Sequence, residues 1–299
     1  MRVPMLLAAS MLTLATARPA YAIQAWESQI ATALGRTGTE MPGGVYRVGL
    51  PRSDLKVNLD GIPIKPSFAL GGWVAFAQHG SGNQVMLMGD LVLTDDEVNP
   101  VMKRLLEGGV EVTALHNHLL KASPHTMYMH VGGHGDAAVL ARTLQAALAL
   151  TKLPAPAAPA SPAAASPALP INVAAVEAAL GRPGKVNNGV LAFSIPRAQP
   201  PREGGMAIPD AMGTAIAINF QPTNGGRAAI TGDFVLAAAE VVPVLRALRT
   251  NGIEVTALHN HMLDEQPRLF FMHFWAENDA VALAKGLRAA LDKVATRRP

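Results

Sequence analysis

The chain has 299 residues, of which 49% are hydrophobic and 16% are charged, and its formal net charge is only +3 at pH 7. Because the positive residues are scattered, the charge pattern gives no indication of nucleic-acid binding. The absence of cysteine excludes disulfides and thiolate metal ligands, and the length is sufficient for two domains with hydrophobic cores.

The first 22 residues have a basic start at Arg2, an apolar run at 5–15 and the sequence Ala-Tyr-Ala at 20–22. This pattern is typical of a secretory signal peptide, and it is too short and wrongly flanked for a membrane-spanning helix. We therefore predict cleavage near Ala22 and a periplasmic or secreted protein with no membrane span.

The rest of the chain consists mainly of two tandem copies of one sequence unit. The stretch GVEVTALHNHLL at 109–120 returns almost unchanged as GIEVTALHNHML at 252–263, so each residue has a counterpart 143 positions later. The same offset relates Asp90 to Asp233 without a gap. A candidate site in one unit is therefore expected in the other.

These units define the predicted domains. We place the first repeat at 23–150 and the second at 171–296. The intervening 151–170 segment consists almost wholly of proline, alanine and serine over most of its length, which favours an extended, semi-rigid linker. Such a linker is long enough for the two repeats to pack on each other in more than one way.

Hydrophobic periodicity and turn residues give both repeats the same order of elements. In the first repeat we predict a helix at 26–34, strands at 45–50, 68–78 and 85–93, a helix from about 96, a histidine hairpin, and a helix at 136–150. The counterparts are a helix at 173–180, strands at 190–195, 215–220 and 228–236, a helix ending near 250, a hairpin, and a helix at 279–294. This order predicts an α+β fold in which each repeat has a mostly antiparallel sheet with helices on one face, leaving the other face to the histidines.

Some element ends allow more than one interpretation. The sequence from Thr94 has a capping-box pattern, but Pro100 would then lie too deep in the helix, so we predict a start nearer Asp96. One strand of each repeat is followed by Pro-Arg. We interpret Arg52 and Arg197 as surface arginines, with the clamping of an anionic ligand as the alternative.

Each repeat carries two histidines one residue apart, followed by a third in a strand-like segment. Because side chains alternate along a strand, His116 and His118 are expected on one face. A turn centred on Ser123 would place His130 opposite His116, and a turn centred on Gln266 gives the same geometry in the second repeat. Three imidazoles would then converge in each repeat: His116, His118 and His130 in the first, and His259, His261 and His273 in the second.

Three histidines that leave a fourth position open are a common way to hold a catalytic zinc ion, and copper or iron also accepts imidazole ligands. We therefore predict a divalent transition-metal site in each repeat, with zinc preferred. Asp90 and Asp233 are candidates either to orient a histidine or to bind the metal directly, with a bulge or turn role as the alternative. The competing interpretation is that the histidines only brace the hairpin.

Catalysis is a further possibility, because bound zinc can lower the pKa of its water to about 7. Beside the second turn, Asp264 and Glu265 are acid–base candidates and Arg268 could steady an anion, which suits metal-assisted hydrolysis of a small substrate that the sequence does not identify. The first repeat has different residues there. The alternative function is a non-catalytic envelope protein that binds a metal or another small ligand.

The words GDFVL, GIEVTALHNHML and PRLFFMHFW resemble the LppY/LpqO-type family of exported bacterial proteins, which is known chiefly as a domain of unknown function. The resemblance covers both repeats. It implies an envelope location and a repeated domain, and it brings no reaction with it. The chain departs from a lipoprotein pattern because it has no cysteine, and its first repeat has Tyr128 where the second has Phe271.

Overall fold

The computed structural model describes residues 24–156 and 168–298. The predicted signal peptide and the middle of the predicted linker lie outside these described residues. Within them, no helix combines the length and the apolar character that crossing a membrane requires.

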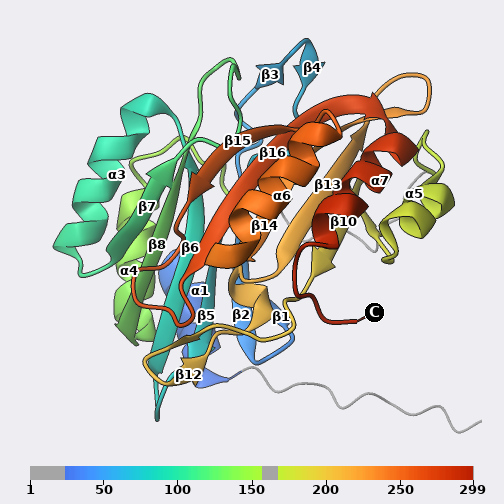
Figure 1. Cartoon of the computed structure of the whole chain (residues 1–299). Coiled ribbons are helices and arrows are strands. Elements are labelled where there is room, and N and C mark those ends of the chain that lie inside the picture. The colour runs from blue at the N-terminus through green and yellow to red at the C-terminus, as the bar shows by residue number, and fades with distance from the viewer. Residues whose placement is uncertain (1–23, 157–167, 299) are drawn as a thin grey trace, which may run out of the picture.

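The first repeat forms a six-stranded antiparallel sheet with strand order β1-β2-β5-β6-β8-β7 (Figure 1). Its elements are α1 (Ala25–Leu34), β1 (Thr39–Met41), β2 (Val45–Pro51), β3 (Asn58–Leu59), β4 (Ile62–Pro63), α2 (Pro66–Ala69), β5 (Gly71–Gln78), β6 (Gln84–Leu93), α3 (Asp95–Glu107), β7 (Glu111–His116), β8 (Met127–Asp136) and α4 (Ala137–Leu148). The start of the strand predicted at 68–78 is instead the short helix α2.

The second repeat has the matching sheet, with strand order β15-β16-β14-β13-β10-β9. Its elements are α5 (Val173–Leu180), β9 (Lys185–Asn187), β10 (Val190–Ile195), β11 (Arg202–Glu203), β12 (Met206–Ala207), η1 (Asp210–Met212), β13 (Ile216–Pro222), β14 (Arg227–Ala237), α6 (Ala238–Thr250), β15 (Glu254–His259), β16 (Leu269–Asp279) and α7 (Ala280–Leu291). Two similar antiparallel sheets with helices confirm the predicted α+β class.

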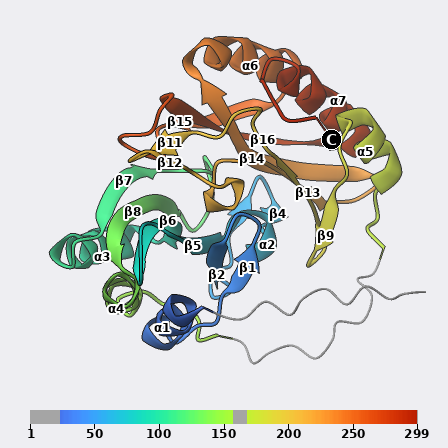
Figure 2. The same cartoon turned by 90° about the horizontal axis from the view of Figure 1, so that it is seen from below.

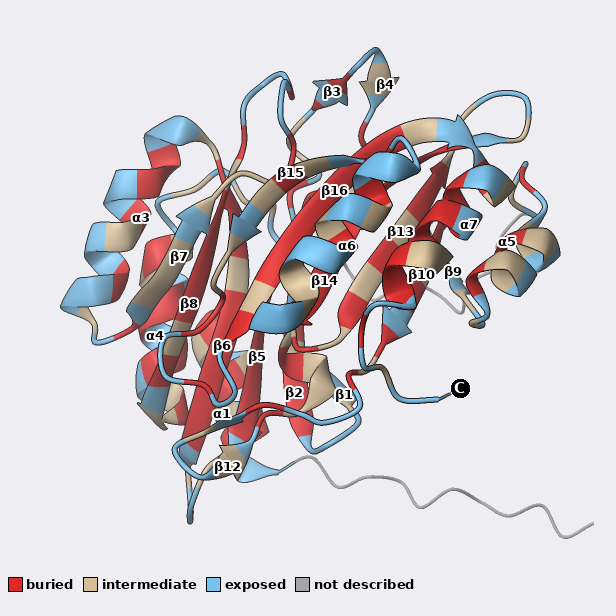
Figure 3. Ribbon diagram, in the orientation of Figure 1, coloured by how far each residue is buried: buried red, intermediate tan, exposed pale blue. Residues whose placement is uncertain are grey.

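The two sheets lie between two outer layers of helices, with α1, α3 and α4 on one side and α5, α6 and α7 on the other (Figure 2). Buried residues predominate in the central strands and recur along one side of the helices (Figure 3). The large core of the second repeat also includes Val45, Ala75 and Met88 from the first sheet. The hydrophobic core is therefore continuous across the interface between the repeats.

Helix α3 begins earlier than predicted, because the capping box does form. The backbone N–H of Thr94 donates to Glu97 Oε2 at 3.0 Å. Pro100 lies inside the helix, where it removes one backbone donor, but it faces solvent, so water can reach the carbonyl left without a partner. The prediction that Pro100 excluded this start was wrong.

Arg52 and Arg197 are buried, so their interpretation as surface residues was wrong. Arg52 Nη1 donates to the Val92 carbonyl at 2.8 Å and to Glu97 Oε2 at 2.6 Å. Arg197 makes the corresponding contact with Glu240 Oε2 at 2.7 Å. Each arginine ties the end of a strand to the first turn of a helix, which leaves neither guanidinium free to clamp an anionic ligand.

Candidate metal centre

The histidine hairpins have a different register from the prediction. His130 pairs with Ala114 instead of His116, and the second repeat shows the same displacement of two residues. An even displacement keeps the histidines on one face of the sheet. It arises because β7 ends at His116 and an irregular loop follows in place of a symmetric turn. His118 and its counterpart His261 therefore lie in loops, not in strands.

The histidines of both repeats meet in one cluster between the sheets. Three ring contacts each join one residue from each repeat, with centroid separations of 3.5 Å for His116 and His259, 3.7 Å for His118 and His273, and 3.6 Å for His130 and His261. The offset between the repeats makes the last two contacts equivalent, so the cluster has an approximate twofold axis. We call these six residues the histidine cluster.

Every member of the histidine cluster has a ring nitrogen that is buried and has no hydrogen-bond partner among the described residues. In two rings the tautomer follows from the other nitrogen: His259 Nδ1 is 2.7 Å from the Asn260 carbonyl oxygen, and His273 Nδ1 is 2.9 Å from that of Gly232. Because a carbonyl oxygen only accepts, Nδ1 carries the proton and Nε2 presents a free lone pair. A buried polar group left unpaired costs about 1–3 kcal/mol, which a metal ion at these nitrogens would offset.

Burial also keeps the histidine cluster neutral. It lowers the pKa of all six imidazoles, and in most of them repulsion from neighbouring histidines lowers the pKa further. The pKa falls to about 4 for His259 and to about 3 for His261. The rings are therefore in their metal-binding form at neutral pH without having to release a proton.

Four sets of three residues could hold a metal ion, and the ligand atoms of each set lie within 4.8 Å of one another. Two sets contain histidines of both repeats: His116, His118 and His273, and His116, His130 and His259. Two sets each combine one aspartate with two histidines of one repeat: Asp90, His118 and His130, and Asp233, His259 and His273. Among the described residues, no set holds the three histidines of one repeat. The ligand atoms are therefore grouped differently from the prediction of one three-histidine site per repeat, and His261 belongs to the cluster but to none of these sets.

Asp90 and Asp233 lie directly opposite His130 and His273 in the sheets. The nitrogen–oxygen distances, 3.7 Å to His130 and 3.8 Å to His273, are too long for hydrogen bonds, and one oxygen of each carboxyl is buried without a partner in the described part of the chain. Burial raises the pKa of Asp90 to about 7, although attraction to Arg47 opposes this, and it raises the pKa of Asp233 well above its usual value. A cation placed between each aspartate and its histidines would stabilise both carboxylates.

Arg47 and Trp73 belong to the site but were not indicated by the sequence motifs. The Arg47 guanidinium lies 3.9 Å above the Trp73 ring and donates from Nη1 to the Ala211 carbonyl at 2.6 Å. The Trp73 ring is 6.2 Å from that of His261. Trp73 pairs with Asp90 in its sheet, whereas the residue paired with the second aspartate is alanine. This difference between the repeats was the feature of the sequence that could have indicated Trp73 as part of the site.

The predicted acid–base candidates are placed in the loop after β15. Glu265 is fully buried, and its carboxylate accepts from the Leu269 backbone N–H at 2.8 Å and from Arg268 Nη1 at 3.2 Å. Arg268 also donates to the Met262 carbonyl at 3.0 Å. Asp264 is exposed. These contacts hold the shape of the loop that carries His261, and none of the three candidates belongs to a metal-ligand set.

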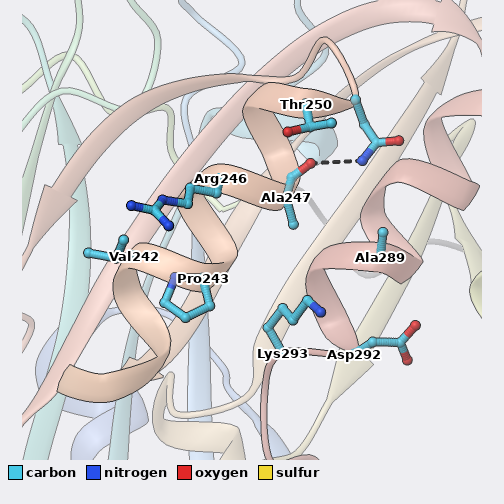
Figure 4. A pocket seen from close by; sticks show the side chains of 9 residues that line it. Val242, Pro243, Arg246, Ala247, Thr250, Ala289, Asp292 and Lys293 are labelled. Carbon is cyan, nitrogen blue, oxygen red and sulfur yellow. Dashed lines mark hydrogen bonds between the residues drawn. The ribbon is translucent and has the colours of Figure 1, made fainter.

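A groove on the opposite side of the second sheet lies between α6 and α7 (Figure 4). Its lining includes Val242, Arg246 and Lys293, and Asn251 Nδ2 donates to the Ala247 carbonyl at 2.8 Å. No histidine of the cluster lines this groove. It is therefore separate from the candidate metal centre.

Comparison with known proteins adds a family. A family model described as "Domain of Unknown Function (DUF1259)" matches residues 28–150 and 174–293, which are the two repeats. No curated protein matches the chain.

Among solved structures, the trimeric bacterial microcompartment shell protein PduB matches with 13% sequence identity and a TM-score of 0.23. The match covers 87% of this chain and 91% of that chain. EtuB from Clostridium kluyveri matches with 11% identity, 85% and 90% covered, and a TM-score of 0.19. Scores this low carry no argument about fold or function.

Proposed function

The chain belongs to the family described as Domain of Unknown Function (DUF1259), which it contains twice, and we propose that its two repeats together bind a divalent transition-metal ion in the histidine cluster. The observation that carries this proposal is the set of buried ring nitrogens that have no partner among the residues the structure describes; these nitrogens come from both repeats and converge on one place. A cluster that only braced the hairpins would be expected to use those nitrogens in hydrogen bonds.

Zinc is the proposed ion, with copper or iron as the other candidates. Neutral imidazole nitrogens and carboxylate oxygens are ordinary zinc ligands, and zinc accepts several geometries. The carbonyl groups that fix the tautomers of His259 and His273 are the kind of partner that orients metal-binding histidines in other proteins.

The test is elemental analysis of the protein purified without a metal-affinity tag. The parent is compared with His130→Ala/His273→Ala, which removes one ring from every one of the four ligand sets. The matched control is His79→Ala/His134→Ala, because these rings contact each other with centroids 5.1 Å apart outside the cluster. We expect bound metal in the parent and the control and its loss in the cluster variant. A parent that stays metal-free after incubation with zinc and copper would leave the cluster structural and overturn the proposal.

Metal-assisted hydrolysis is the second candidate function. It is favoured by the Arg47 guanidinium beside the cluster, which could hold an anionic substrate group near a metal-bound water. Without a substrate that turns over, the protein would be a non-catalytic metal-binding module. Export by cleavage near Ala22, a periplasmic location and the narrower LppY/LpqO-type relationship are further parts of the proposal, and they are supported by the sequence patterns alone.

A further inference from the structure

The two aspartate-containing sets have no residue in common. We call Asp90, His118 and His130 the first-repeat triad, and Asp233, His259 and His273 the second-repeat triad. Each triad offers two imidazole nitrogens and one carboxylate oxygen within 4.8 Å of one another. Three such ligands are sufficient to hold a divalent ion with further coordination positions open. The cluster therefore contains two complete sets of ligands that do not compete for a side chain.

The triads are also immediate neighbours. His118 of the first and His273 of the second have ring centroids 3.7 Å apart, and both belong with His116 to one of the cross-repeat sets. Ions bound to the two triads would therefore lie close together. Proteins that use paired ions hold them about 3.5–4 Å apart, so that one oxyanion can contact both.

We propose that the histidine cluster holds two metal ions side by side, one on each triad, and that the ligand of this centre is an oxyanion that bridges them. This inference rests on the proposed function and deepens it. The cross-repeat histidine sets, both of which include His116, are then explained by one ring that lies between the two ions.

Charge balance points to the oxyanion. The carboxylates of Asp90 and Asp233 offset only half the charge of two divalent ions, and the imidazoles are neutral. Arg47 adds a further positive charge on the first-repeat side, and it forms no ion pair among the described residues. Uncompensated charge is costly to bury, so an anion in the centre would stabilise the loaded protein.

Arg47 also makes the centre asymmetric. Arg47 lies in β2, two residues before Gly49, and Gly49 pairs with Trp73. In the second repeat the corresponding pair is Ser194 and Ala217. The residue two positions before Ser194 is an alanine, so the second repeat has no arginine at the position of Arg47. The cation is therefore present at one end only. A phosphate that bridges the ions through two of its oxygens would direct its remaining oxygens towards Arg47, where a guanidinium can donate to them.

The number of ions is tested by metal content and by electron paramagnetic resonance of the manganese(II)-loaded full chain. His118→Ala/His130→Ala and His259→Ala/His273→Ala each disable one triad, with His79→Ala/His134→Ala as the control. We expect about two ions in the parent and control, about one in each triad variant, and an exchange-coupled manganese spectrum in the parent. One ion in the parent, lost completely in either variant, would overturn the pair but retain the proposed function. The parent spectrum decides the matter even if a variant does not fold.

The ligand is tested with inorganic phosphate added to the cobalt(II)-loaded protein while the visible spectrum is recorded. We expect saturable binding in the parent, binding weakened about tenfold in Arg47→Met with unchanged metal content, and partial recovery in Arg47→Lys. A spectrum that phosphate does not change would overturn the oxyanion. Equal affinity in the parent and Arg47→Met would overturn the role of Arg47.

Discussion

At the scale of single residues, Asp90 shows what the centre requires of its side chains. It is a carboxyl group buried beside neutral imidazoles, and among residues 24–156 and 168–298 its Oδ1 has no hydrogen-bond partner. Its pKa is raised from 3.8 to about 7 by burial. In the metal-free protein folding therefore favours the protonated form of Asp90. The free energy of unfolding falls as the pH rises from the unfolded pKa of 3.8 through the folded pKa of about 7.

The first prediction concerns Asp90→Asn in the presence of a chelator. Because asparagine cannot ionise, the metal-free variant should be more stable than the parent at pH 8, by up to about 4 kcal/mol, and the difference should disappear near pH 4. Urea unfolding at the two pH values measures this. A difference of the same size at both would contradict the burial of an ionisable carboxyl.

The histidines act in the opposite direction, as His261→Phe should show. The pKa of His261 is lowered by burial to about 3, so its contribution to stability is complete above its ordinary pKa of 6.5 and is lost as the pH falls towards 3. The parent should lose up to about 1.4 kcal/mol more than the variant for each pH unit in that window.

The ring of phenylalanine preserves the packing of His261 against His130 and Trp73. The metal-free proteins are compared by urea unfolding between pH 7 and pH 4. His134→Phe is the control, since the His134 side chain is 41% exposed, whereas His261 is buried. Parallel pH profiles for the parent and His261→Phe would show that His261 remains free to take up a proton in the folded state.

At the scale of elements, alternation and turn residues were sufficient to predict most strands and helices and the face on which the histidines lie. They were not sufficient for the register, because β7 ends at His116 and its hairpin has a bulge between Val112 and Ala114, which no local pattern marks. The sequence also did not indicate that the Arg52 side chain is buried. A Pro-Arg pair after a strand has the same sequence whether the arginine is in solvent or under a neighbouring helix.

The burial of Arg52 leads to a prediction about stability alone. Arg52→Met leaves the buried Glu97 carboxylate without its cation and the start of α3 without its tie to the strand. The free energy of unfolding should fall by about 3–5 kcal/mol. Metal content should not change in the folded fraction, because the arginine lies away from the histidine cluster. Urea unfolding and elemental analysis measure the two quantities, and loss of metal from a folded variant would contradict this separation.

At the scale of the whole molecule, the histidine cluster exists only where the repeats meet. The repeat pattern predicted one metal site in each unit, because the repeated sequence segments contain the same three histidines. It contained no information about docking, which brings His116 against His259 and makes two half-sites into one cluster. The interface that does this is polar as well as apolar. Thr113 Oγ1 donates to the His261 carbonyl at 2.7 Å, and Asn260 Nδ2 donates to the Thr113 carbonyl at 2.9 Å.

The last prediction is that this interface, and not the covalent connection, holds the centre together. A protease site placed within 157–167 should be cut without separating the halves, which should elute as one species in gel filtration and keep their metal. The substitution Gln221→Leu, made in the same cleavable protein, weakens the interface between the repeats. Gln221 accepts from the Lys65 backbone N–H at 2.9 Å and donates to the Pro63 carbonyl at 2.8 Å. Its loss removes two hydrogen bonds to the first repeat, which are worth about 0.5–1.5 kcal/mol each. The cut variant should therefore dissociate at a higher protein concentration than the cut parent, and its exchange-coupled manganese spectrum should disappear as it does so, because each triad stays with its own repeat. If the manganese(II)-loaded cut parent separated into halves and still gave an exchange-coupled spectrum, both ions would have to lie within one repeat, and a centre shared across the interface would be wrong.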